Sequence, residues 1–313
     1  MQYVVKKTGV LIVTLLLVSL LAFLAFQIIP GDPTTMLLGT EYSPERAEAL
    51  REELGLNRNV FLRYFEWLGG FVTGNMGRSY SYSMDVREVL RGKIAVTAML
   101  SILSWILVTL VSIPLGIALA RYKGRRIEQI TVSHNQIFMS IPSFFLGILF
   151  TFLFGLVLKW FTPGKFIPFS QSFWGCVGYL FFPALAISIP KIAKVAKLLR
   201  SSILSEMQQD YVLTAYSHGN SRWMVIRHHV LRNALLPVVT YLAMSLADIV
   251  ASSIIVEQVF VIPGLGRLLI ASISNRDYPV ALCIVVIIAS IVVVMNYLAD
   301  VLTQTIDPRV RLS

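Results

Sequence analysis

The sequence has few charged residues and few cysteines for its length. Only 14% of its 313 residues are charged, whereas a typical soluble domain has about 25%. Its two cysteines, Cys176 and Cys283, lie in or beside apolar stretches and cannot build a disulfide framework. The low charge argues against a soluble domain, and the low cysteine count argues against a fold held together by disulfides.

The sequence also lacks recognisable catalytic and phosphate-binding motifs. It contains no G-x-x-x-x-G-K-[S/T] phosphate loop, no H-E-x-x-H, no G-x-S-x-G and no C-x-x-C. The histidines do not suggest a chelating site, because adjacent residues such as His228 and His229 point about 100° apart on a helix. We therefore expect this chain to be no enzyme and to hold no catalytic residue, metal or cofactor.

What the sequence has instead is long apolar runs. It is 56% hydrophobic, with a mean hydropathy of +0.72. About 20 apolar residues cross a bilayer core of roughly 30 Å as a helix, because lipid cannot satisfy unpaired backbone groups. These runs predict an all-α integral membrane protein with six transmembrane helices, at residues 9–29, 95–120, 130–158, 178–199, 235–258 and 281–303. Prolines inside these spans, such as Pro142, can kink them.

The basic residues predict the orientation of these spans. An even number of spans leaves both termini on one side, and 15 of the 27 Lys and Arg residues fall on that side. The positive-inside rule then makes the N- and C-termini cytoplasmic. The net charge of +10 therefore reflects cytoplasmic loops. We expect a lipid bilayer, and no nucleic acid, as a partner.

The spans divide the chain into four parts. Residues 1–29 form an N-terminal transmembrane helix, 30–94 an extracytoplasmic helical segment, 95–304 the transmembrane domain and 305–313 a cytoplasmic tail. In the extracytoplasmic segment we expect one helix at 43–56, capped by Ser43 and ended by Gly55, and a second amphipathic helix at 59–77. The segment is either a structural cap or a docking surface for an extracytoplasmic partner.

The cytoplasmic segment DYVLTAYSHGNSRWMVIRHHVLRNALLP, residues 210–237, lies between the fourth and fifth spans. We expect a helix from Lys191 to about His218, a break at Gly219 in a left-handed conformation, and a short amphipathic helix after it. Asn220 or Ser221 can cap that helix. It can dock into a groove on a cytoplasmic partner or lie on the membrane surface. Basic residues at every third position of the preceding helix are expected to face solvent or lipid headgroups: Lys191, Lys194, Lys197 and Arg200.

The same segment resembles the EAA loop of ABC importer permeases. In the dipeptide, oligopeptide and nickel branch the loop usually reads like DYxxTAxxxGLS…HxLRNAxLP. The matching residues here are Asp210, Tyr211, Thr214, Ala215, Gly219, Ser221, His229, Leu231, Arg232, Asn233, Ala234, Leu236 and Pro237, and the departures are Tyr216, His218 and Asn220. Six further stretches resemble the family in order: PGDP (30–33), ELGL (53–56), NMGRS (75–79), VEQVFVIPGLGRLL (256–269), NRDYPV (275–280) and DPR (307–309).

The resemblance implies a type I ABC importer transmembrane domain at 95–304, with a coupling loop at about 205–234. The chain would be a multi-pass permease subunit of the cell membrane that forms half of a translocation pathway. Its implied partners are a second homologous permease, two cytoplasmic ABC ATPases that hold ATP and Mg²⁺, and an extracytoplasmic solute-binding protein. The implied coupling residues are Asp210, Thr214, Ala215, His218, Gly219, Ser221, Arg222, Trp223, Arg232, Asn233 and Pro237.

The cargo stays open at this point. Di- and oligopeptides are favoured as the commoner cargo of the family, and nickel or a metal chelate is the alternative. Asp248 in the fifth span, with Ser252 one turn later, is a candidate for the translocation pathway, because intramembrane carboxylates are rare and costly. Asp248 can instead have a structural partner at a helix contact. An ion-coupled secondary transporter using Asp248 is a further alternative, although six spans without an internal repeat argue against it.

Overall fold

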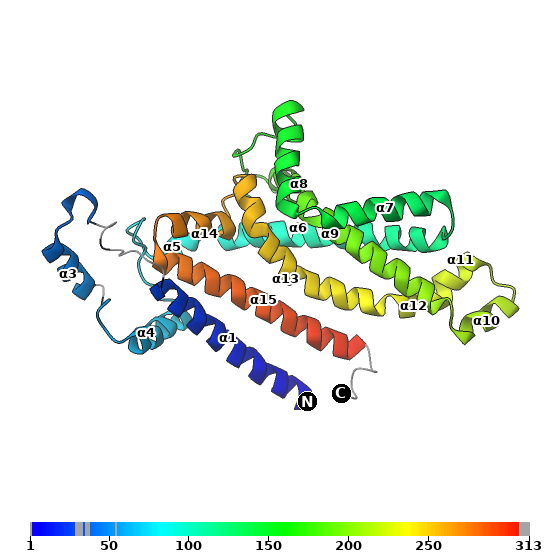
Figure 1. The fold of residues 1–313 in the computed structure, drawn as a ribbon, viewed down its shortest axis with the longest axis horizontal. Helices are drawn as coiled ribbons and strands as arrows, with labels where there is room; N and C mark the ends of the chain where they lie inside the picture. Colours follow the sequence, from blue (N-terminus) through cyan, green and yellow to red (C-terminus); the bar gives the residue numbers. More distant parts are fainter. Residues whose placement is uncertain (1, 29–33, 35–37, 54, 307–313) are drawn as a thin grey trace. The chain divides into compact units, whose positions relative to one another are not determined.

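The computed structural model describes residues 2–28, 34, 38–53 and 55–306, and all regular elements in these ranges are helical (Figure 1). Five helices are long and apolar enough to cross a membrane: α1 (Gln2–Ile28), α6 (Lys93–Arg121), α9 (Phe173–Glu206), α13 (Leu236–Val259) and α15 (Tyr278–Ile306). These helices coincide with five of the six predicted spans. The predicted all-helical membrane class is therefore confirmed.

The remaining predicted span, 130–158, is not one continuous helix. α7 (Arg126–Ser140) meets α8 (Ser143–Phe150), which the π-helical segment η2 (Thr151–Val157) continues, at an angle of 97°. The backbone between them is extended at Ile141 and Pro142. Proline lacks an N–H and disfavours helix at the residue before it. The kink that Pro142 was expected to allow is present as this sharp bend. The structure has five apolar helices long enough to cross a membrane, or six spans if the bent pair counts as one.

The chain folds into two compact units. Unit 1 comprises Met1–Thr97 and Pro263–Val293, and unit 2 comprises Ala98–Ile262 and Val294–Ser313. Each unit is described separately below.

The short helices of unit 1 are η1 (Gly39–Glu41), α3 (Pro44–Glu53), α4 (Val60–Thr73), α5 (Val86–Leu90) and α14 (Leu265–Ser274). Side-chain caps begin two of them, at the predicted Ser43 and at Asn59, which was not predicted as a cap. The Arg46 N–H donates to Ser43 Oγ (3.2 Å) and the Phe61 N–H to Asn59 Oδ1 (2.9 Å). The two helices predicted at 43–56 and 59–77 are both present, each slightly shorter than expected. The PGDP and DPR stretches lie outside the described residues.

An aromatic core joins α1, α4 and α15 in unit 1. Phe23, Tyr64, Leu282 and Val286 are buried together, and Trp67 packs against them. The Tyr64 hydroxyl lies 2.8 Å from Ser19 Oγ and donates to the Leu16 carbonyl at 3.2 Å. These contacts dock one face of α4 onto α1, because a buried tyrosine needs a partner for its hydroxyl.

A buried carboxylate joins two loops of unit 1. Asp277 is fully buried and accepts hydrogen bonds from Ser79 Oγ, from the Tyr80 N–H (3.1 Å) and from the Ser81 N–H (3.2 Å). The NMGRS and NRDYPV stretches therefore meet at this residue, although they are about 200 positions apart in the chain. Both stretches are among those that resemble the permease family. In the structure, the hydrogen bonds to Asp277 join them.

Unit 2 is built around α9, which packs against α7, α8 and α13. Hydrogen bonds also tie α6 to its neighbours: Trp105 Nε1 donates to the Leu242 carbonyl (2.8 Å), and Ser188 Oγ to the Ser104 carbonyl (3.0 Å). A side chain at Gly116 would lie 2.8 Å from Leu199 Cβ, so the small residue allows α6 and α9 to approach closely. α9 is therefore the scaffold from which the segment at residues 210–237 emerges.

Candidate functional site

The candidate site is the segment between α9 and α13, which forms a series of short helices. They are α10 (Asp210–Ser217), α11 (Arg222–Val225), the π-helical η3 (Ile226–Val230) and α12 (Leu231–Ala234), and they lie beyond the end of α9 (Figure 1). The predicted continuous helix from 191 to 218 was wrong, because α9 ends at Glu206 and Gln209 is extended. Asp210 in the first turn of α10 was a signal for a new helix start.

Gly219 ends α10 as predicted. Its φ is +79° and its N–H donates to the Tyr216 carbonyl at 2.9 Å. No atom lies within 4 Å of the position that a Cβ would occupy, so the backbone conformation alone demands glycine here. Of the two expected caps, Ser221 is confirmed, since its Oγ accepts the Met224 N–H at 3.4 Å. Asn220 instead donates to the Ala215 carbonyl at 3.0 Å.

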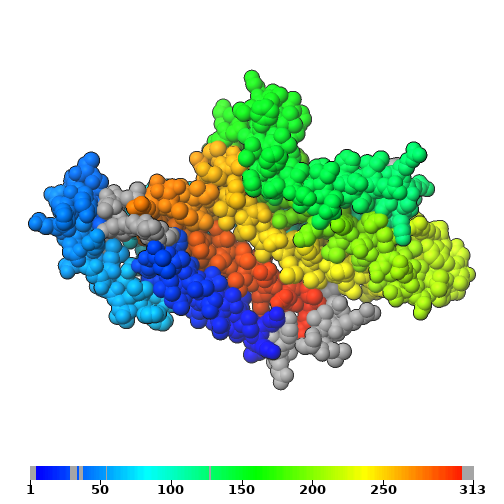
Figure 2. Space-filling view, in the orientation of Figure 1, coloured from blue at the N-terminus to red at the C-terminus, as the bar shows by residue number. Residues whose placement is uncertain are grey.

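The short helices have one buried face and one exposed face. The inward side chains are all at most 5% exposed: Val212, Ala215, Val225, Ile226, Val230 and Ala234. The outward apolar side chains include Leu213, which is 68% exposed, and Tyr216, Trp223 and Met224. In the space-filling view this yellow-green segment forms the end of its unit (Figure 2). Exposed apolar groups on a rigid base are typical of a partner-binding surface.

Two contacts attach α11 to the end of α6. The Arg121 guanidinium lies over the Trp223 ring, 4.8 Å from its centroid, and Arg222 Nη2 donates to the Ala120 carbonyl at 3.4 Å. A cation over an indole ring contributes about 0.5–1 kcal/mol at an exposed site. α11 is thereby attached to α6, while the following η3 and α12 pack against α9. Arg121 was not among the predicted site residues, although its position as a basic residue at the end of a span was an available signal.

Tyr211 links α10 to both α9 and α12. Its hydroxyl donates to Glu206 Oε2 at the end of α9 (2.7 Å) and accepts from Asn233 Nδ2 in α12 (3.5 Å). Partial burial and the hydrogen bond to Glu206 raise the pKa of the Tyr211 phenol above its usual value. The phenol therefore remains a donor at neutral pH. Neither Tyr211 nor Glu206 was among the predicted site residues, although Tyr211 belongs to the matching pattern.

Replacing Tyr211 by phenylalanine is expected to loosen α10. The change removes the hydroxyl that links Glu206 and Asn233 and costs about 1 kcal/mol, so amide exchange in residues 210–217 should become about fivefold faster. Hydrogen–deuterium exchange of the assembled complex measures this. Tyr216→Phe is the matched control, because no hydrogen bond of the Tyr216 hydroxyl is recorded in the described structure. Equal exchange in both variants would contradict the bracing role.

The predicted basic face of α9 is only partly correct. Arg200 forms an ion pair with the buried Glu128, Lys197 Nζ donates to Gln136 Oε1 (3.1 Å), and Lys194 lies over the Tyr241 ring (5.0 Å). A spacing of three rotates each successive residue by about 60° around a helix. The four residues therefore do not share one solvent face, and these three contact the neighbouring helices α7 and α13.

The other predicted site residues fall into two places. In the segment at residues 210–237, Ala215 is buried and the exposed members are Asp210, Thr214, His218, Arg232, Asn233 and Pro237. Asp248 lies apart from them, exposed on α13, and interacts electrostatically with Lys191 of α9. Ser252 Oγ donates to the Asp248 backbone carbonyl (2.7 Å), so the two side chains are not paired. Among the described residues, no group of three His, Cys, Asp or Glu side chains could hold a metal ion.

Comparison with known proteins identifies the family. Residues 112–312 match the family described as the binding-protein-dependent transport system inner membrane component, and residues 1–86 match the N-terminal region of such membrane components. The chain is a member of this family of ABC importer permeases. With its five or six apolar helices, the permease is a multi-pass protein of the cell membrane.

Several relatives align with almost the whole permease. It is 34% identical to a Brucella abortus protein whose name assigns it to a peptide transport system, over 98% of both chains. It is 33% identical to the oligopeptide transport system permease protein AppB of Bacillus subtilis, over 98% of both chains. It is 31% identical to the dipeptide transport system permease protein DppB of Escherichia coli K12, over 99% of both chains. The predicted family is confirmed, and these matches do not support a secondary transporter.

A solved structure described as an amino acid ABC transporter with histidines overlaps with the permease at a TM-score of 0.49. The two are 21% identical, and the overlap covers 71% of the permease and 94% of that chain.

Proposed function

We propose that this permease forms half of the translocation pathway of an ATP-driven importer of di- and oligopeptides. The observation that carries the proposal is its 31–34% identity, over nearly its whole length, to proteins named for peptide, oligopeptide and dipeptide transport. None of the three is named for nickel, which favours peptides over nickel or a metal chelate as cargo.

The proposed partners are those of a complete importer: a second homologous permease, two cytoplasmic ABC ATPases and an extracytoplasmic solute-binding protein. ATP and Mg²⁺ would bind to the ATPases, since this sequence contains no phosphate loop. The segment 205–234 would couple them to the spans. Its exposed Leu213, Trp223 and Met224, on helices attached to α6 and α9, support that role. The coupling residues predicted from the sequence are retained in this proposal.

The proposed topology has six spans, with α7, α8 and η2 counted as one, and both termini in the cytoplasm. Residues 1–29, 30–94, 95–304 and 305–313 would then be the first span, the extracytoplasmic segment, the transmembrane domain and the tail. The distribution of Lys and Arg supports this orientation.

The cargo is tested by ATP hydrolysis of the complete importer in proteoliposomes, with its solute-binding protein. Peptides are expected to stimulate hydrolysis, and free or chelated nickel is not. Stimulation by nickel alone would overturn the peptide proposal. Failure to assemble with any ATPase subunit would overturn the proposed coupling.

Asp248→Asn tests the translocation pathway in the same system. If the Asp248 carboxylate binds the peptide amine, losing its charge is expected to raise the KM for transport about tenfold with little change in the maximal rate. Ser252→Ala is the control, because the Ser252 hydroxyl is bonded within α13. An unchanged KM in the Asp248 variant would show that the carboxylate has a structural role beside Lys191.

A further inference from the structure

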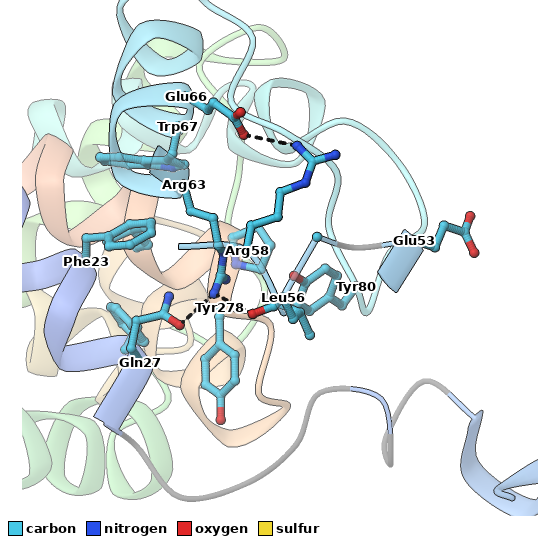
Figure 3. A pocket seen from close by; sticks show the side chains of 14 residues that line it. Phe23, Gln27, Glu53, Leu56, Arg58, Arg63, Glu66, Trp67, Tyr80 and Tyr278 are labelled. Atoms are coloured by element: carbon cyan, nitrogen blue, oxygen red, sulfur yellow. Dashed lines mark hydrogen bonds and ion pairs between the residues drawn. The ribbon is translucent and has the colours of Figure 1, made fainter. Parts of the chain in front are cut away.

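Unit 1 contains a cavity of about 440 Å³ between α1, α4, the start of α15 and the loops at residues 55–58 and 80 (Figure 3). One wall is aromatic: the Phe23 and Trp67 rings lie 5.9 Å apart, as do the Phe26 and Tyr278 rings. Leu282 adds a further apolar side chain. Neither the proposed coupling residues at 205–234 nor Asp248 lines this cavity, so the cavity is not part of the sites described above.

The guanidinium of Arg63 projects into the cavity between Gln27 and Leu56 (Figure 3). Its Nη1 donates to Gln27 Oε1 (3.1 Å) and to the Leu56 carbonyl (3.2 Å), both of which are neutral acceptors. None of the ion pairs recorded for the described residues includes Arg63, and Glu66 at the rim lies 3.6 Å from Arg58 instead. Burial lowers the pKa of Arg63 below its usual value, yet a guanidinium remains charged at neutral pH.

Arg63 therefore offers an anion an unused part of its donor fork. A guanidinium has five N–H donors arranged to bind phosphate or carboxylate in a bidentate manner. Within the described residues, only Nη1 has recorded acceptors. The chemistry of the cavity suits an anionic group attached to an apolar body, because the charged fork and the aromatic wall share one space.

The position of the cavity points to a lipid as the source of that anion. Phe23, Phe26 and Gln27 belong to the last turns of α1, which ends at Ile28, and Tyr278 begins α15. Both helices are membrane spans, so their ends lie at headgroup depth, where tyrosine and tryptophan are enriched. The face of α4 turned away from α1 is also apolar, with Phe61, Leu62, Phe65 and Val72 each at least 60% exposed. Such a helix is suited to lie in the bilayer interface.

We propose that this cavity binds the headgroup phosphate of an anionic phospholipid, with Arg63 as its ligand and the aromatic wall against its glycerol and upper acyl chains. α4 would lie in the membrane interface beside it. The lipid would fill the space between α1 and α4 and hold the extracytoplasmic segment on the membrane.

The test is lipid retention by the complete importer, purified from nanodiscs of equal phosphatidylglycerol and phosphatidylcholine and analysed by native mass spectrometry. Arg63→Gln is expected to reduce retained phosphatidylglycerol about fivefold, the factor that corresponds to roughly 1 kcal/mol for one basic residue near an anionic surface. Arg46→Gln is the matched control, because Arg46 is exposed, pairs with Glu41 and does not line the cavity. Unchanged retention in Arg63→Gln would overturn the proposal.

A second variant keeps the test decisive if Arg63→Gln does not assemble. Arg63→Lys retains the charge without the fork, and it is expected still to prefer phosphatidylglycerol over phosphatidylcholine. Equal retention of both lipids by Arg63→Lys would overturn the proposal. So would displacement of the lipid by inorganic phosphate or by a cargo dipeptide in the wild-type complex, because the site would then serve a free anion or the peptide carboxylate.

Discussion

Replacing Gly219 by proline is expected to abolish cargo-stimulated ATP hydrolysis while leaving the importer assembled. Proline fixes φ near −65° and has no N–H, whereas Gly219 has φ +79° and donates to the Tyr216 carbonyl. The turn between α10 and α11 cannot form with that residue. Because α11 is attached to α6 through Trp223 and Arg222, its displacement should lower stimulation by more than about tenfold, given a local cost of ~3 kcal/mol.

A matched pair of alanine variants separates backbone conformation from side-chain size. Gly219→Ala forces a left-handed alanine, at a cost of about 1–2 kcal/mol, and should reduce stimulation partially. Gly178→Ala in α9 also has nothing within 4 Å of its Cβ but has ordinary helical backbone, so it should behave like wild type. Stimulation should be measured in proteoliposomes at saturating peptide. Full stimulation in Gly219→Pro would show that the segment is not the coupling element.

Replacing Asp277 by alanine is expected to be the most destabilising change in unit 1. The carboxylate accepts hydrogen bonds from Ser79, Tyr80 and Ser81 while fully buried. Hydrogen bonds to a charged group contribute about 1.5–3 kcal/mol each, and their donors would lose this acceptor. The free energy of unfolding should therefore fall by roughly 3–5 kcal/mol, measured by thermal or denaturant unfolding of the importer in detergent.

The control for this variant is an aspartate of the same segment. Asp85 precedes α5, is exposed, and its side chain makes no capping hydrogen bond. Asp85→Ala should change stability by less than about 0.5 kcal/mol. Asp277→Asn keeps one acceptor oxygen and should fall between the two. Equal stabilities of Asp277→Ala and Asp85→Ala would mean that the 75–81 loop does not depend on the buried carboxylate.

Local signals predicted the parts of the fold that depend on neighbouring residues. Ser43 identified the start of one helix, and Gly219 with Ser221 identified the turn between α10 and α11. Pro142 indicated where the predicted span 130–158 can bend, but hydropathy carried no information on the 97° angle. The break between α9 and α10 was missed, although Asp210 was a local signal for the new helix start.

The sequence by itself determined that this protein is a helical membrane protein, because hydrophobic length and cap residues act locally. Its resemblance to the permease family was also visible there, because the motif at residues 210–237 is contiguous. Only the tertiary structure decided which distant residues meet. It placed Asp277 against the 79–81 loop and Arg121 over Trp223, and it left Arg63 in an aromatic cavity. Such contacts depend on how helices pack, and the packing of helices far apart in the chain has no periodic signature in one sequence.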